Sequence, residues 1–194
     1  MNLIKILRSL ILLGLITQLT GCAVVAVGGA AAATGTAVVD RRTTGTLVED
    51  QTIEVKAIKA IHENAELNEQ AHINVTSYNT VVLITGETPT DALRQKAMEL
   101  VKNIDKVTHV YNELTIAAPS SMTSRGSDSI ITTKVKTKLF ADKKVSGIQF
   151  KVVTEKGVVY LIGIVSRAEA EIATDIARQT GGVQKVVKLF QYTD

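Results

Sequence analysis

The sequence has no tryptophan, few aromatic residues of any kind (4%) and one cysteine in 194 residues. A single cysteine excludes a framework of disulfides, because such frameworks use cysteines in pairs. The shortage of aromatic side chains leaves little on which nucleic-acid bases could stack beside a basic surface, which argues against a nucleic-acid-binding protein. The apolar residues are mostly Val, Ile, Ala and Leu, a composition that suits small units of closely packed helices and sheets.

The apolar stretch nearest the N-terminus is too short to cross a membrane. It runs from Leu10 to Ile16 and follows Lys5 and Arg8, whereas a bilayer span needs about 20 apolar residues. A basic start, a short apolar run and small or polar residues after it predict a secretory signal peptide over residues 1–21.

The stretch Leu19-Thr20-Gly21-Cys22 resembles a lipobox, the site at which bacterial lipoprotein precursors are cut. The resemblance implies that Cys22 is lipidated and becomes the first residue of the mature chain. The alternative is an ordinary signal peptide that leaves an unpaired thiol. An aspartate after the cysteine would imply retention at the inner membrane, and Ala23 stands there instead. The motif therefore implies an anchor in the outer membrane, facing the periplasm.

Small residues dominate the segment after Cys22, which we interpret as a flexible tether over residues 22–45. Ala, Gly, Val and Thr bury too little surface to offset the entropy lost on ordering them. The tether would hold the rest of the chain close to the membrane.

No arrangement of residues in the sequence suggests catalysis or metal binding. His62, His72 and His109 lack the spacing of metal ligands, and no nucleophile motif of the Gly-x-Ser-x-Gly type is found. We therefore predict no catalytic residues, no metal site and no cofactor.

An internal repeat decides the fold. Each copy carries the same apolar positions in the same order, as in Val81-Val82-Leu83-Ile84-Thr85-Gly86 against Val158-Val159-Tyr160-Leu161-Ile162-Gly163. A helix comes first in each copy, with apolar residues every fourth position and with Asp50 or Asp128 expected as its N-cap. A β-hairpin, a second helix and a last strand follow.

This order, α-β-β-α-β, predicts an α+β fold in which each copy forms a three-stranded mixed sheet with two helices on one face. Two such copies, each with a glycine closing its central apolar strand, resemble BON domains. We expect the first domain over residues 46–117, a linker over 118–127 and the second domain over 128–194. With the lipobox, the resemblance is to outer-membrane lipoproteins with tandem BON domains. It implies a non-enzymatic protein that binds anionic phospholipid through its second domain and supports outer-membrane integrity at the division site.

The two copies carry opposite net charges. Residues 46–117 contain 6 basic and 11 acidic side chains, a net charge of −5, and residues 127–194 contain 11 basic and 7 acidic ones, a net charge of +4. Because an anionic lipid surface attracts each nearby Lys or Arg, the second copy is expected to bind phosphatidylglycerol or cardiolipin. The first copy is expected to be repelled.

The first helix of the second copy carries the candidate lipid-binding residues. Its core stripe contains Ile131, whereas Ile130 lies about 100° away around the helix. Side chains expected on the same face as this apolar tip are Thr133, Lys134, Thr137 and Lys138. An apolar residue among lysines is typical of a helix that lies in a lipid interface. The alternative is that Ile130 packs on the linker or on the other domain, with the lysines facing solvent.

A second function class remains open, a protein-interaction adaptor that docks on outer-membrane assembly proteins. Strands such as Val81–Ile84 are apolar on both faces, and one layer of helices covers only one face. The other face would pack the two domains together or receive a protein partner.

Replacing Cys22 tests the inference that this residue carries the lipid anchor. We expect Cys22→Ser to yield a soluble, folded periplasmic protein, because the tether separates Cys22 from both repeats. Fractionation of cell envelopes measures this. If the Ser variant stays with the outer membrane as fully as the wild-type chain, Cys22 is not the anchor.

Overall fold

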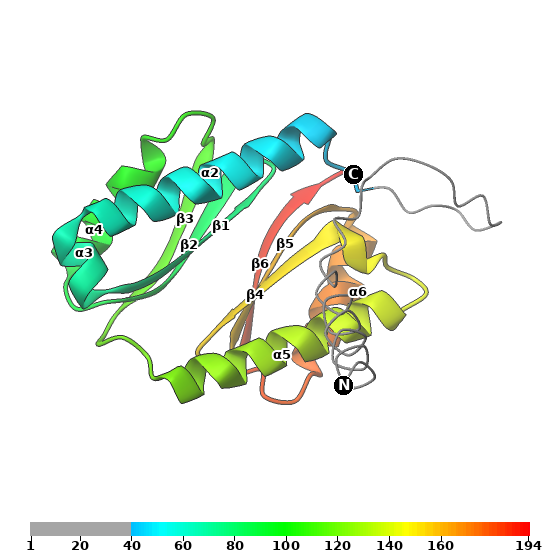
Figure 1. Cartoon of the computed structure of the whole chain (residues 1–194). Coiled ribbons are helices and arrows are strands. Elements are labelled where there is room, and N and C mark those ends of the chain that lie inside the picture. Colours follow the sequence, from blue (N-terminus) through cyan, green and yellow to red (C-terminus); the bar gives the residue numbers. More distant parts are fainter. Residues whose placement is uncertain (1–39) are drawn as a thin grey trace, which may run out of the picture. The chain divides into compact units, whose positions relative to one another are not determined.

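The computed structural model describes residues 40–194, which belong to one compact unit (Figure 1). The expected signal peptide, Cys22 and most of the expected tether lie outside the described residues.

The first repeat is built around the central strand of a three-stranded sheet. Its elements are α2 (Thr44–Glu63), α3 (Ala65–Gln70), β1 (His72–Tyr78), β2 (Val81–Thr88), α4 (Asp91–Lys102) and β3 (His109–Ile116). Strand β2 pairs antiparallel with β1 and parallel with β3. The mixed sheet is therefore the predicted one, and α3 is a short addition that the sequence pattern did not indicate.

The second repeat has the same topology. Its elements are α5 (Met122–Ala141), the short 3₁₀ helix η2 (Gly147–Gln149), β4 (Phe150–Glu155), β5 (Val158–Val165), α6 (Arg167–Arg178) and β6 (Lys185–Tyr192). The central strand β5 pairs antiparallel with β4 and parallel with β6. The prediction of two α+β repeats in the order α-β-β-α-β is confirmed.

The first helix of each repeat begins earlier than predicted. Thr43 caps α2 and Ser121 caps α5, each through a side-chain oxygen that accepts from the backbone N–H three residues later. The prediction that Asp50 and Asp128 are N-caps was wrong, and α5 starts within the segment expected as linker. Ser and Thr are good N-caps, and extending a helix that is already packed costs little.

Asp50 and Asp128 instead tie each first helix to its hairpin. Both carboxylates are buried. Asp50 accepts hydrogen bonds from the backbone N–H groups of Asn79 and Thr80, both at 2.8 Å. Asp128 accepts equivalent bonds from Lys156 and Gly157 at 2.9 and 2.8 Å. These turn residues have positive φ, the conformation of the tight turns that match strand twist, so the carboxylates hold the turns in place.

Glycine is required at the end of each hairpin where the backbones approach most closely. A Cβ on Gly86 would lie 1.9 Å from the carbonyl oxygen of His72, and one on Gly163 would lie 2.5 Å from that of Gln149. The glycine that closes each central apolar strand is therefore required by this close approach of the backbones.

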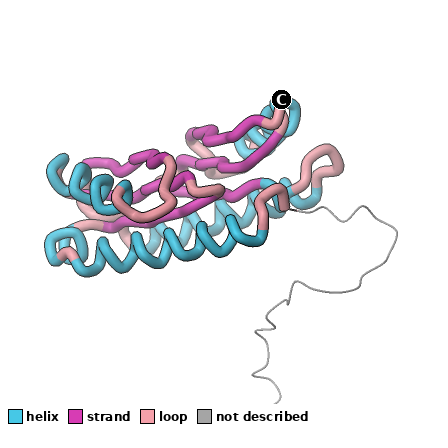
Figure 2. Tube along the Cα trace, turned by 90° about the horizontal axis from the view of Figure 1, so that it is seen from above, coloured by secondary structure: helices cyan, strands magenta, loops and turns pink. Residues whose placement is uncertain are grey.

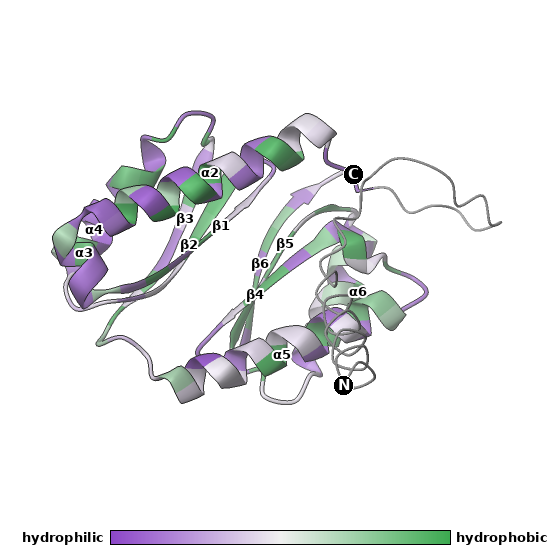
Figure 3. Cartoon of the chain, in the orientation of Figure 1, coloured by the Kyte–Doolittle hydropathy of each residue, from purple (hydrophilic) through white to green (hydrophobic). Residues whose placement is uncertain are grey.

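The two sheets pack on each other through the faces that their helices leave uncovered. Helices lie outside and strands inside in Figures 1 and 2, and Figure 3 shows hydrophobic residues along the central strands. Each repeat has its own core between helices and sheet. A third apolar cluster joins the sheets through Tyr78, Leu83, Tyr160, Ile162 and Leu189. The second strand face is thus used for packing between domains.

Removing one of the turn-binding carboxylates tests its role. We expect Asp128→Ala to lower the free energy of unfolding by about 2–4 kcal/mol, because two turn N–H groups, one buried and one partly buried, lose their acceptor. Its neighbour Ser129→Ala, at an exposed position, is the control and should melt close to the wild-type temperature. Thermal unfolding followed by circular dichroism measures both, and equal melting temperatures would contradict this role for Asp128.

Candidate functional site

The outer surface of α5 carries all five predicted lipid-binding residues. Ile130 is 58% exposed, whereas the neighbouring core residue Ile131 is 8% exposed. Thr133, Lys134 and Thr137 are exposed on the same side of the helix. The described residues thus leave Ile130 uncovered by either domain.

The two threonines present methyl groups more than hydroxyl donors. The Oγ1 of Thr133 donates to the carbonyl of Ser129, and that of Thr137 donates to the carbonyl of Thr133, both at 2.9 Å. A hydroxyl that donates to a carbonyl of the preceding helical turn has no proton left to donate to a ligand. The surface beside Ile130 is therefore more apolar than its sequence suggests.

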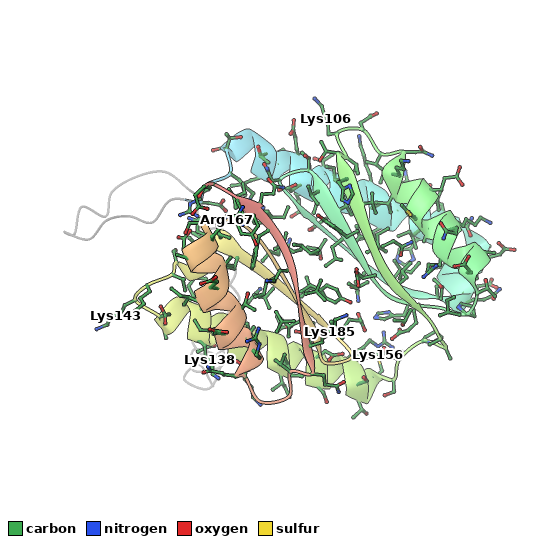
Figure 4. All side chains as sticks on the ribbon, turned by 180° about the vertical axis from the view of Figure 1, so that it is seen from behind. Lys106, Lys138, Lys143, Lys156, Arg167 and Lys185 are labelled. Atoms are coloured by element: carbon green, nitrogen blue, oxygen red, sulfur yellow. The ribbon has the colours of Figure 1, made fainter. Side chains whose placement is uncertain are left out.

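The two lysines differ in where their ammonium groups lie. Lys134 has no ion pair or hydrogen bond among residues 40–194, so its charge is available to a ligand. The Nζ of Lys138 donates to the carbonyl of Gln179, at the end of α6, at 3.3 Å. Figure 4 labels Lys138 beside α6. Lys138 is exposed but is directed toward α6 and away from Ile130.

The sequence pattern did not single out Phe140, which is 65% exposed near the end of α5. It lies about 80° from Ile130 around the helix and borders a hollow of about 570 Å³ that Lys143, Lys144 and Ile148 also line. Lys143, labelled in Figure 4, projects from the loop that follows the helix. Asp142 and Glu169 line the same hollow, so Phe140 extends the apolar part of the surface, with charges of both signs around it. Its position off the stripe of Ile131, Val135 and Leu139 was the available signal.

Opposite charges meet where the two repeats pack. Lys151 of β4 pairs with Glu54 of α2, with Nζ to Oε1 at 2.8 Å. Lys156, labelled in Figure 4, pairs with the fully buried Glu87 of β2 at 2.9 Å. A buried carboxylate needs such a partner to remain charged. These ion pairs reinforce the apolar contact between the sheets.

A second buried carboxylate, Glu155, lies in the same junction. Its Oε2 accepts a hydrogen bond from the side-chain amide of Asn74 at 3.1 Å, and its Oε1 has no hydrogen-bond partner within residues 40–194. Burial raises the pKa of Glu155, the Asn74 bond opposes this rise, and the nearby charge of Glu87 adds to it. The carboxyl borders a hollow of about 430 Å³ that His72 and Arg125 also line.

Within residues 40–194 the histidines form no metal site, and no group of three or more potential metal ligands is found. His62 contacts Asn68, His72 lies at the junction of the repeats, and His109 stacks edge-on against Tyr111. The three histidines therefore lie in different parts of the structure and make different contacts. No helix within the described range is long and apolar enough to span a membrane.

The repeats match a known family. Residues 49–118 and 127–194 each match the BON domain. The chain belongs to the BON domain family. It is 39% identical over 194 residues to the outer membrane lipoprotein DolP of Haemophilus influenzae, with all of both chains covered. It is also 39% identical to a 21 kDa hemolysin of Actinobacillus pleuropneumoniae, over 79% of each chain.

A more distant relative is the osmotically-inducible protein Y of Escherichia coli K12. It is 32% identical over 147 residues, which cover 73% of this chain and 72% of that protein. With the full-length similarity to DolP, these relatives identify the chain as an outer-membrane lipoprotein of the cell envelope.

Neutralising Glu155 tests the charge balance of the junction. Because its pKa is higher in the folded than in the unfolded chain, where it is near 4.5, its contribution to stability falls as pH rises through the folded value. We expect Glu155→Gln to raise the free energy of unfolding by about 1 kcal/mol at pH 7.5 and to have little effect at pH 4. Urea unfolding at both pH values measures this, with the exposed Glu171→Gln as control. A loss of stability at pH 7.5 would show that the ionised carboxyl is needed there.

Proposed function

We propose that the protein is a non-enzymatic lipoprotein that binds anionic phospholipids, phosphatidylglycerol or cardiolipin, through α5 of its second BON domain. The observation that carries the proposal is the pairing of exposed apolar tips, Ile130 and Phe140, with Lys134 on α5 and Lys143 in the loop after it, whose side chains have no partner in the described part of the chain. Apolar side chains enter the interface of a bilayer while neighbouring lysines meet its phosphates. Through this contact the protein supports outer-membrane integrity, with placement at the division site as part of the proposal.

The energies involved suit a contact that orients an anchored protein. Full burial of Ile130 or Phe140 contributes about 1.5–3 kcal/mol each, and each lysine near an anionic surface adds about 1 kcal/mol. Such a sum corresponds to about millimolar to micromolar affinity. A lipid anchor on Cys22 would keep α5 near the membrane and make the contact effectively intramolecular, so weak affinity would suffice.

The competing proposal is an adaptor for outer-membrane assembly proteins. It relied on an apolar strand face that would receive a partner. The cluster containing Tyr78, Leu83 and Tyr160 occupies that face in the contact between the sheets. This use of the surface favours the lipid-binding proposal.

Substituting the apolar tip of α5 tests the function. In the soluble Cys22→Ser form, we expect Ile130→Glu to abolish flotation with phosphatidylglycerol vesicles and to leave the melting temperature nearly unchanged, because the side chain is off the core. Ile116→Glu is a matched control, since Ile116 at the end of β3 is 55% exposed and the charge change is the same. It should float as the parent does.

Ile131→Glu is the control for disruption of the core. It should unfold the domain. If Ile130→Glu melts as low as Ile131→Glu, or floats as well as its parent, the lipid-binding assignment of α5 is wrong. If the parent ignores anionic vesicles but retains a defined assembly protein, the adaptor proposal replaces it.

A further inference from the structure

Helix α2 of the first domain also exposes an apolar surface. Val48 and Val55, seven residues apart and so on one side of the helix, are 63% and 57% exposed. Leu47 and Ile58 are exposed beside them. Among the apolar residues of 40–194 that remain exposed, these four form a continuous stripe along one helix.

The stripe borders a shallow groove whose chemistry suits an anionic lipid surface. The groove has a volume of about 580 Å³ and is lined by Thr44, Leu47, Val48, Gln51, Thr52, Val55 and Lys56, with no carboxylate. Lys56 and Lys59 flank the stripe. Their ion pairs, with Asp105 at 3.8 Å and with Glu63 at 3.7 Å, are long and exposed. Such pairs contribute little, so lipid phosphates can replace them.

The net charge of −5 in the first repeat does not describe this surface. Several of its carboxylates are engaged elsewhere: Asp50 binds the hairpin turn and Arg42, Glu54 pairs with Lys151 and Glu87 pairs with Lys156. Outward, α2 presents the apolar stripe together with Lys56, Lys59 and the exposed carboxylate of Glu63. The net charge of the whole repeat therefore overstates the negative charge that α2 presents to an anionic lipid surface.

One edge of the stripe lies on the flank of α2 that faces the second domain, whereas Val48 and Val55 lie about 100–120° further around the helix, on its outward side. Leu47 and Ile58, seven residues before and four after Glu54, share its side of the helix, and Glu54 reaches Lys151 of β4. Lys56, on the opposite flank, reaches Asp105 beyond α4. Figures 1 and 4 agree that α2 and α5 lie on one side of the unit and α4 and α6 on the other.

We propose that α2 is a second lipid-contacting helix, so that the unit docks on an anionic bilayer through one helix from each repeat. The inference rests on the proposed function of α5 and extends it to the first domain. A bilayer is favoured over a protein partner by the groove without carboxylates, by the flanking lysines and by the place of α2 as the first described helix after Cys22, the proposed anchor.

The absence of tryptophan allows each position to be tested separately. Single tryptophans are introduced as Val55→Trp, Ile130→Trp and Ile116→Trp in the soluble Cys22→Ser form. With vesicles containing phosphatidylglycerol, we expect the emission of Val55→Trp and Ile130→Trp to shift to the blue and to be quenched by brominated lipid, because tryptophan resides in the interface. Ile116→Trp should respond to neither. The double variant Val48→Glu/Val55→Glu should bind about tenfold or more weakly than the parent.

The outcomes separate the two proposals. If Ile130→Trp responds while Val55→Trp does not, the inference about α2 is overturned and the function of α5 stands. If Val55→Trp responds while Ile130→Trp does not, α5 is not the lipid-binding helix and the proposed function fails in its present form. If the emission of Val55→Trp shifts with protein concentration in the absence of vesicles, the stripe pairs copies of the chain and the lipid assignment of α2 is overturned.

Discussion

The contact between the two sheets is the constraint on which the rest of the structure depends. A three-stranded sheet with helices on one face leaves its other face exposed to water, and the central strands β2 and β5 are apolar on both faces. Each repeat removes this surface from water by packing on the other, through Tyr78, Leu83, Tyr160 and their neighbours. Burial of apolar surface is the main force in such packing, and it places the helices in the outer layer, where they remain available to ligands.

The opposite charges of the two repeats form ion pairs across the contact between the sheets, so they are not all available to a membrane. Lys151 and Lys156 of the second repeat meet Glu54 and Glu87 of the first. Net charge of a whole domain is therefore a poor guide to its behaviour at a lipid surface, because charges used inside the protein are no longer available outside. What remains on α5 is the charge of Lys134, which has no partner in the described residues, and what remains on α2 is an apolar stripe with two weakly paired lysines.

Local patterns in the sequence were enough to predict the elements and their order. The four-residue spacing around Ile131 predicted its burial, and the repeat predicted that both sheets share one topology. The role of Asp50 and Asp128 could not be predicted, because they bind turns almost 30 residues away and the Ser-rich segment before Asp128 suggested a linker. Pairs such as Glu54 with Lys151 join residues 97 positions apart, and no local spacing reports such a contact. Phe140 follows the core residue Leu139 directly, and only the four-residue spacing, which places Leu139 on the stripe of Ile131 and Val135, tells which of the two faces outward.

The fixed packing of the two sheets on each other also explains how weak lipid contacts could act together. Because the repeats share an apolar cluster and ion pairs, one of them to the buried Glu87, α2 and α5 cannot reorient independently. Once one helix lies on a bilayer, the orientation of the other is already set, and its contact requires little further loss of rotational freedom. Two modest contacts on one rigid unit then reinforce each other in the same way that an anchor reinforces either one. A flexible linker between the domains would forfeit that gain, so the interface between the repeats would contribute to the proposed membrane binding without touching lipid.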